Sequence, residues 1–129
     1  MHALNRQIAA CKDTPFKYGV FDCTQFAIAC EKAIHGSTAF PELERAYATK
    51  RQGFAIMSAL GFKNVWALVS ARLEEISLLD AKRGDLVGHI ASGRCFGIYA
   101  SKAGFYCASE SGGVMLSPLS DIVKVWRRR

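Results

Sequence analysis

The sequence lacks the features that mark membrane proteins, exported proteins and small metal ribbons. No apolar run approaches the roughly 20 residues that a membrane-spanning helix needs, and the N-terminal segment has no long apolar stretch of the signal-peptide kind. We therefore expect a protein that is made and folded in a reducing cytoplasm. No C-x-x-C pair is present, which argues against a zinc ribbon or a thioredoxin-like site.

The sequence also has few charged residues, and its number of cysteines is odd. Its 129 residues suffice for one domain, and 22% charged against 50% hydrophobic residues indicates a globular chain. An odd count of five cysteines excludes complete intramolecular pairing. A free cysteine most simply packs as a small hydrophobic side chain. The five are Cys11, Cys23, Cys30, Cys95 and Cys107.

The net charge of +6 is concentrated at the C-terminus. Three of the 17 basic residues are Arg127, Arg128 and Arg129, and the rest of the chain has an ordinary charge balance. The sequence contains no helix-turn-helix pattern, no interleaving of aromatic and basic residues and no RNA-binding motif. We expect a solvated tail and no specific nucleic-acid partner.

The first part of the chain shows helical periodicity. Apolar residues in 23–34 recur at helical spacing, Asp22 is a suitable N-cap and Gly36 a suitable C-terminal residue. Thr49 and Gly61 likewise bound a helix whose inner side would carry Phe54, Ile56, Met57 and Leu60. The remaining predicted helices are 2–12, 42–48 and 64–73, and 16–21 reads as an extended aromatic segment.

After residue 80 the pattern changes to short apolar runs separated by turns. The predicted strands are 86–90, 95–100, 105–108, 114–116 and 123–126. Helices followed by about five strands with tight turns indicate an α+β fold with a mostly antiparallel sheet. We predict one domain, 1–129, mainly helical in 1–80 and mainly strands in 81–129.

Cys23 is the candidate nucleophile. A thiol attacks only as the thiolate, and a helix N-terminus lowers the thiol pKa through its dipole and free N–H groups. Cys23 is predicted at the first helical position, behind the Asp22 cap. The alternative interpretation is a buried cysteine that merely begins a helix.

Several motifs resemble those of the NlpC-like, papain-fold cysteine peptidases, which cut peptidoglycan stem peptides and occur in phage tails. The nucleophile segment of that family is similar to Tyr18-Gly19-Val20-Phe21-Asp22-Cys23-Thr24. Its later strands resemble Gly84-Asp85-Leu86-Val87, Arg94-Cys95-Phe96-Gly97-Ile98-Tyr99 and Phe105-Tyr106-Cys107-Ala108. The resemblance implies a papain-like fold, with N-terminal helices packed on the sheet and Tyr18 and Asp22 at the ligand cleft.

The chain is more similar still to a small uncharacterised family of phage and prophage proteins. The shared motifs are Tyr47-Ala48-Thr49, Gly84-Asp85-Leu86, Pro118-Leu119-Ser120 and Trp126-Arg127, besides the Phe-Asp-Cys helix start. This resemblance implies other tail proteins as partners and peptidoglycan as a further possible partner. It also implies that the protein is located in the host bacterial cytoplasm during assembly and then in the virion. It implies no cofactor.

The departures from the peptidase pattern decide the functional expectation. Cys95 and Cys107 stand where the peptidases carry the basic and the orienting histidine. A thiol cannot replace an imidazole as general base near neutral pH. We therefore expect a tail-associated protein that has lost the usual catalytic His and has a structural or assembly role at the tail tip.

Two alternatives remain open. The first is an active peptidoglycan-cleaving peptidase or amidase in which His89, on the 86–90 strand, serves as base for Cys23; the strand register decides whether it can. The second is a convergence of Cys23, Cys95 and Cys107, which would allow a zinc site, an iron–sulfur cluster or a disulfide. Incubation with peptidoglycan separates the first alternative from the structural role.

Overall fold

The computed structural model describes residues 2–91 and 93–129, and there the fold is α+β, as predicted. Its helices are α1 (His2–Ala10), α2 (Cys23–His35), α3 (Lys50–Leu60) and α4 (Val65–Arg72). Its strands are β1 (Glu74–Ile76), β2 (Leu86–Ile90), β3 (Arg94–Ser101), β4 (Gly104–Ala108), β5 (Val114–Ser117) and β6 (Ile122–Arg127). Short 3₁₀ turns occupy Pro41–Leu43, Leu78–Asp80 and Leu119–Asp121.

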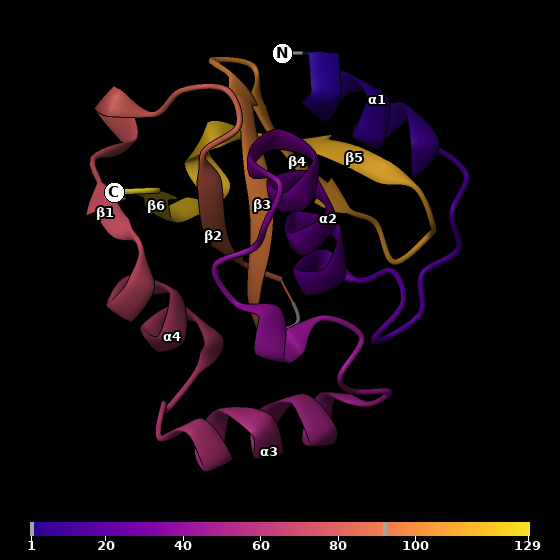
Figure 1. Cartoon of the computed structure of the whole chain (residues 1–129). Coiled ribbons are helices and arrows are strands. Elements are labelled where there is room, and N and C mark those ends of the chain that lie inside the picture. The colour runs from indigo at the N-terminus through magenta and orange to yellow at the C-terminus, as the bar shows by residue number, and fades with distance from the viewer. Residues whose placement is uncertain (1, 92) are drawn as a thin grey trace.

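The strands form one antiparallel sheet in the order β1-β6-β2-β3-β4-β5. Helix α2 lies against β3 and β4, and α1 lies beside α2 (Figure 1). Strand β6 enters between β1 and β2, so the end of the chain is held inside the sheet. This arrangement directs the N-terminus of α2 toward the turn between β2 and β3.

Helix α2 forms where the sequence predicts it because both of its ends are capped. The Asp22 carboxylate accepts a hydrogen bond from the Gln25 N–H, and Gly36 ends the helix with φ 80°. Its apolar face carries Phe26, Ile28 and Cys30 into the main core. The opposite wall of this core is formed by Phe96, Ile98 and Trp126, all of them fully buried.

The other helical segments depart from the prediction. Only Pro41–Leu43 of the predicted 42–48 helix forms, as a single 3₁₀ turn. Helix α3 has the predicted caps, but it buries Met57 alone, while Phe54 remains 67% exposed and Leu60 38% exposed. The reason lies in its position: α3 lies apart from the sheet at the far end of the molecule (Figure 1), and periodicity does not reveal whether a partner covers an apolar face.

Residues 16–21 form a tight turn rather than an extended segment. Lys17 and Phe21 pair across it, and Gly19 adopts φ 80°. A Cβ on Gly19 would lie 1.7 Å from the Tyr47 carbonyl oxygen, so the turn and the following loop approach each other as only glycine permits. The turn brings the loop before α2 close to the Tyr47 segment.

The predicted sheet of about five strands has a sixth strand, β1, in the described part of the chain. Glu74, Glu75 and Ile76 pair with Arg127, Trp126 and Val125 of β6. The strand is short, acidic and at the sheet edge, so it carries none of the apolar alternation that marks a strand in sequence. The boundary between a helical and a strand half therefore falls before β1.

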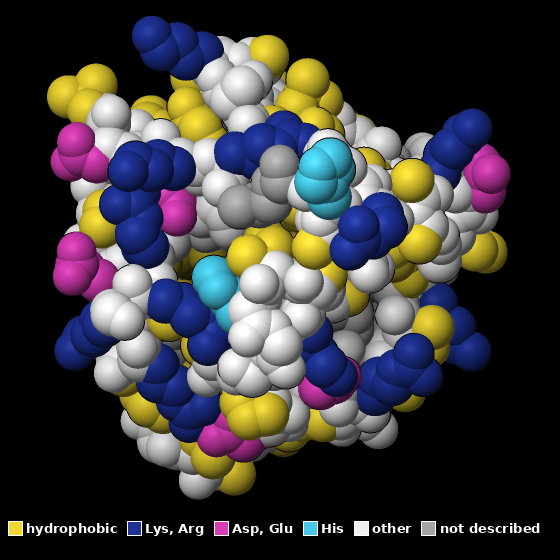
Figure 2. All heavy atoms as spheres, turned by 45° about the horizontal axis from the view of Figure 1, so that its top comes forward, with side chains coloured by type: hydrophobic (Ala, Val, Ile, Leu, Met, Phe, Trp, Pro, Cys, Tyr) yellow, Lys and Arg dark blue, Asp and Glu magenta, His cyan; other side chains and the backbone are white. Residues whose placement is uncertain are grey.

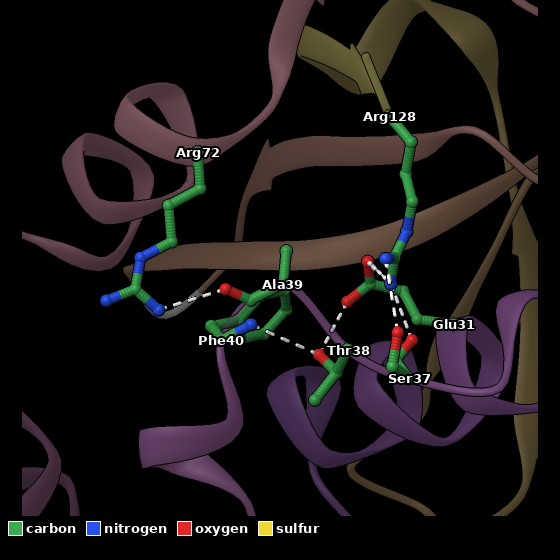
Figure 3. Close-up of polar contacts among 7 residues, drawn as sticks. All are labelled: Glu31, Ser37, Thr38, Ala39, Phe40, Arg72 and Arg128. Carbon is green, nitrogen blue, oxygen red and sulfur yellow. Dashed lines mark hydrogen bonds and ion pairs between the residues drawn. The ribbon is translucent and has the colours of Figure 1, made fainter.

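The three C-terminal arginines are not a solvated tail. Arg127 belongs to β6 and pairs with Asp85 at 2.6 Å, and Arg128 reaches Glu31 and Ser37 near the end of α2 (Figure 3). Arg129 donates a hydrogen bond to the Leu73 carbonyl. Because β6 lies inside the sheet, its continuation is held against the body, which a terminal position in the sequence does not reveal.

Basic side chains are nevertheless spread over the face that lies at the top of Figure 1, interleaved with acidic ones (Figure 2). In the part that the structure describes, no single helix is long and apolar enough to cross a membrane. Helices α3 and α4 meet that criterion together by length and composition only, with a bend of 45° between them.

Candidate functional site

A cavity of about 240 Å³ opens at the N-terminus of α2. Its wall on the sheet side comes from the ends of β2, β3 and β4, and its other wall from the 16–18 turn and the start of α3. Six residues of its lining are considered for chemistry, namely Tyr18, Asp22, Cys23, Tyr47, His89 and Cys95, and the lining also contains charged Lys50, Arg94 and Glu110. Five of these six were singled out from the sequence for catalysis or the cleft, namely Tyr18, Asp22, Cys23, His89 and Cys95.

Asp22 organises the floor of this cavity. Its buried carboxylate accepts hydrogen bonds from the Gly19 N–H at 2.9 Å, from the Gln25 N–H at 2.8 Å and from the Tyr47 hydroxyl at 2.8 Å. Burial and the Asp22 charge raise the pKa of Tyr47, which keeps this phenol protonated as a donor. The carboxylate is thus occupied in holding the loop, the helix and Tyr47 together.

Tyr47 is a site residue that the sequence reasoning did not assign. Its only signal was the Tyr47-Ala48-Thr49 motif, which fixed no contact. Tyr18 lines the cavity, as predicted for the cleft, and its ring packs edge-on against Phe16 with 5.2 Å between centroids. The Lys50 ammonium lies 5.7 Å from the centre of the Tyr18 ring.

The thiols of Cys23 and Cys95 are hydrogen-bonded to each other. Cys23 is the first residue of α2 and Cys95 the second residue of β3, so the contact joins helix and sheet. The Phe96 N–H lies close to the Cys23 sulfur, and the Ala91 N–H, which donates to the Gly93 carbonyl at 3.0 Å, lies close to the Cys95 sulfur. Both cysteines are only partly buried.

The two thiols have opposite pKa shifts. The hydrogen bond from Cys23 is the largest influence on Cys95 and lowers the pKa of Cys95 to about 7, against the opposing effect of burial. The hydrogen bond to Cys95, followed by burial, raises the pKa of Cys23. Of the two thiols, Cys95 is therefore the more acidic, and Cys23 holds its proton more firmly. The lowering of the Cys23 pKa that a helix N-terminus favours is opposed here by Cys95 and by burial.

The register of the β2–β3 hairpin determines which residue lies opposite His89. Its direct cross-strand partner is Cys95. The Nε2 atom of His89 lies 3.2 Å from the Phe96 carbonyl, and the ring packs against Phe105 at an angle of 52° with 4.8 Å between centroids. Burial lowers the pKa of His89, so the imidazole is neutral near pH 7. His89 therefore lines the cavity as the neighbour of Cys95, with one ring nitrogen engaged by backbone.

Cys107 lies in a different environment from Cys23 and Cys95. Its buried sulfur lies 3.4 Å from the Ser117 hydroxyl on the neighbouring strand β5, and burial raises its pKa. Among residues 2–91 and 93–129, no group of three or more His, Cys, Asp or Glu side chains is arranged to hold a metal ion. The geometry thus brings two of the three predicted thiols together and engages the third elsewhere.

One comparison with known proteins bears on this arrangement. Residues 1–128 match a family described as a domain of unknown function, DUF6950. The chain belongs to the DUF6950 family. No curated protein matches it. Because the match spans nearly the whole chain, the cavity and its thiol pair lie inside the family domain, and the domain's function has to be argued from them.

Proposed function

We infer that this DUF6950 domain is a tail-associated component of a phage or prophage with an NlpC-like cysteine-peptidase fold that does not carry the usual Cys–His chemistry. The observation that supports the loss of chemistry is the contact between the Cys23 and Cys95 thiols. In the resembling peptidases, the residue at the position of Cys95 is the histidine that takes the proton from the nucleophile.

The proton balance of the pair explains why a thiol does not substitute for that histidine. In the peptidases a neutral imidazole takes the proton from the nucleophile, and the resulting imidazolium stabilises the thiolate beside it. A Cys95 thiolate that takes this proton becomes a neutral thiol, so the Cys23 thiolate has no positive partner, and ionisation of both sulfurs is opposed by charge repulsion. Cys23 therefore stays protonated at neutral pH.

The supporting geometry is that of a retained cleft. The helix-start cysteine, the Asp22 cap and the aromatic wall are all in place around the cavity. We expect this cleft to serve a structural or assembly role, with other tail proteins as partners and peptidoglycan as a further possible contact. The protein would act in the host cytoplasm during assembly and afterwards in the virion.

Peptidoglycan digestion tests the loss of chemistry. We expect the wild-type protein to release no more soluble muropeptides than a Cys23→Ala variant. A Cys95→His variant restores an imidazole beside Cys23, and we expect it to cleave above that background if the fold is that of the peptidases. Cleavage by the wild type that disappears in Cys23→Ala contradicts the proposal.

Virion composition tests the setting. Particles purified from an induced host that carries this gene should contain the chain, detected by mass spectrometry, in company with tail components. A matched lysate of a strain in which the gene is deleted provides the control. Absence of the chain from intact particles, with normal expression in the cell, contradicts the tail assignment.

The alternative is an active peptidoglycan-cleaving peptidase or amidase that uses Cys23. The observation that favours it is the presence of neutral His89 in the same cavity as both thiols. In this arrangement His89 is nearest in register to Cys95, so Cys95 would have to relay the proton. Loss of cleavage in both Cys95→Ser and His89→Ala, with folding intact, would support this alternative over the inactive cleft.

A further inference from the structure

The five cysteines fall into two groups by environment. Cys11, Cys30 and Cys107 are buried, and Cys11 and Cys107 are each bonded to a side chain, Gln7 or Ser117. Cys23 and Cys95 are partly exposed, line the cavity and contact each other. Any reagent that enters from solvent therefore meets this pair first.

The pair is held by the fold rather than by chance contact. Cys23 is fixed at the first turn of α2 by the Asp22 cap, and Cys95 is fixed by pairing with His89 in the hairpin. The Trp66 indole N–H also donates a hydrogen bond to the Cys95 carbonyl at 3.2 Å. Both sulfurs are thus positioned on separate elements that meet only in the folded chain.

We propose that Cys23 and Cys95 form a redox-active dithiol that is converted to an intramolecular disulfide by low-molecular-weight disulfides. The inference does not depend on the tail assignment or on peptidase activity. It rests on two partly exposed thiols in contact inside an open cavity, carried by a helix and a strand that the fold brings together.

The exchange proceeds in two displacements. The Cys95 thiolate attacks one sulfur of the oxidant, a new S–S bond forms, and the first thiolate of the oxidant leaves. The Cys23 thiol then loses its proton to that thiolate and attacks the Cys95 sulfur, expelling the second half as a thiolate. The protein pair is oxidised by two electrons, and the small disulfide is reduced to one thiol and one thiolate.

The expected consequence is a covalent bond between the start of α2 and the start of β3. Glutathione and thioredoxin keep such a pair reduced in a cytoplasm, whereas an extracellular medium favours the bond. The bond would join the two walls of the cavity and remove both thiols from chemistry.

Oxidised glutathione is the probe for the experiment. The full-length reduced protein is incubated with it, excess thiols are alkylated, and peptides are mapped by mass spectrometry without reduction. Trypsin followed by chymotrypsin, which cleaves after Phe26, separates Cys23 from Cys30. We expect a product lighter by two hydrogen atoms whose cross-linked peptides contain Cys23 and Cys95.

Two single variants give opposite expected results. Cys23→Ser keeps the attacking sulfur and lacks the resolving one, so a stable mixed disulfide with glutathione should accumulate on Cys95. Cys95→Ser removes the attacking thiolate, and adduct formation should slow by about ten-fold or more because the remaining thiol keeps its proton. Cys107→Ser is the matched control and should cross-link at the wild-type rate.

The wild-type peptide map decides the question even if a variant fails to fold. A wild-type protein that stays fully reduced, that ends as a glutathione adduct without the cross-link, or that links Cys107 instead overturns the proposal. So does a folded Cys23→Ser variant that traps no glutathione on Cys95.

Discussion

The two ends of α2 show contrasting chemistry. At its N-terminus, a carboxylate accepts three hydrogen bonds from neutral donors, and two thiols meet at an open cavity. Near its C-terminus, Glu31 lies buried with the Thr38 hydroxyl at 2.8 Å and the Arg128 guanidinium at 3.4 Å (Figure 3). The first end keeps reactive groups accessible, and the second end closes the fold around the last residues of the chain.

The difference shows how one helix can be stabilised at both ends and carry a candidate site at only one. The ion pair at the C-terminal end ties Arg128 to Glu31, although the buried Nε atom of Arg128 has no hydrogen-bond partner there. The thiol pair makes only weak sulfur contacts, with each other and with backbone N–H groups, which a reagent can replace. Variants at the two ends therefore test whether reactivity and stability are separated in this way.

Asp22→Ala should have the largest effect on stability. It removes the helix cap and leaves the Gly19 N–H and the Tyr47 hydroxyl without their acceptor, a loss of about 3 kcal/mol in the free energy of unfolding. Urea titration followed by circular dichroism measures it. Asp22→Asn retains an acceptor oxygen and should lose clearly less; equal losses would contradict the hydrogen-bond account.

Cys30→Ser should have the next largest effect. Cys30 is 0% exposed in the apolar core, so the serine hydroxyl would lack a partner there and destabilise the fold by about 2 kcal/mol. Cys23→Ser should lose less than about 1 kcal/mol, because its hydroxyl can use the same hydrogen bonds as the thiol. If Cys23→Ser were the more destabilising of the two, the division into packing and site cysteines would be wrong.

Glu31→Gln should have a smaller effect that depends on pH. Burial raises the pKa of Glu31 in the folded state, against the opposing effects of Thr38 and Arg128. A carboxyl with a raised folded pKa stabilises below its unfolded pKa, and this contribution is lost as pH rises through the folded pKa. Unfolding titrations between pH 4 and pH 8 should show the variant gaining stability relative to wild type with rising pH; a declining difference would contradict the assignment.

Glu42→Gln should have the smallest effect. The Arg72 guanidinium holds Glu42 by two bonds, of 2.7 Å and 2.6 Å, and lowers the pKa of Glu42 to about 2. Because the pair is one-third exposed, its removal should reduce stability by less than about 1 kcal/mol near neutral pH. The contribution is present above the unfolded pKa and is lost as pH falls through about 2. Lys124→Gln, which breaks a comparable surface pair with Glu75, is the control, and a pH-independent loss in Glu42→Gln would contradict this interpretation.

Much of the fold could be predicted because it depends on short-range sequence patterns. Capping residues Asp22, Gly36, Thr49 and Gly61 lie at the helix ends at which they were expected. The five apolar strands form near their predicted positions, since alternation and turn residues are short-range signals. Strand β1 was not predicted because its residues show little apolar alternation and because its conformation depends on pairing with β6.

The candidate site was predictable only in part. Cys23 could be assigned to a helix start from Asp22 and the following periodicity, and it is found there. The lowered pKa of Cys95 and the packing of the His89 ring against Phe105 follow from contacts between separate elements. A one-residue change of register would have reversed the His89 assignment, and no local pattern excludes it.

The sequence alone thus determined the fold class, the capped ends of α2 and the position of a cysteine at its first residue. Only the tertiary structure decided that this cysteine meets a second thiol, that Cys107 does not join them, and that the terminal arginines are bound by Glu31 and Asp85. The physical reason is the separation along the chain over which each kind of interaction acts. Caps and periodicity act over one or two helical turns, whereas these contacts exist only after the helix docks on the sheet and β6 inserts between its neighbours.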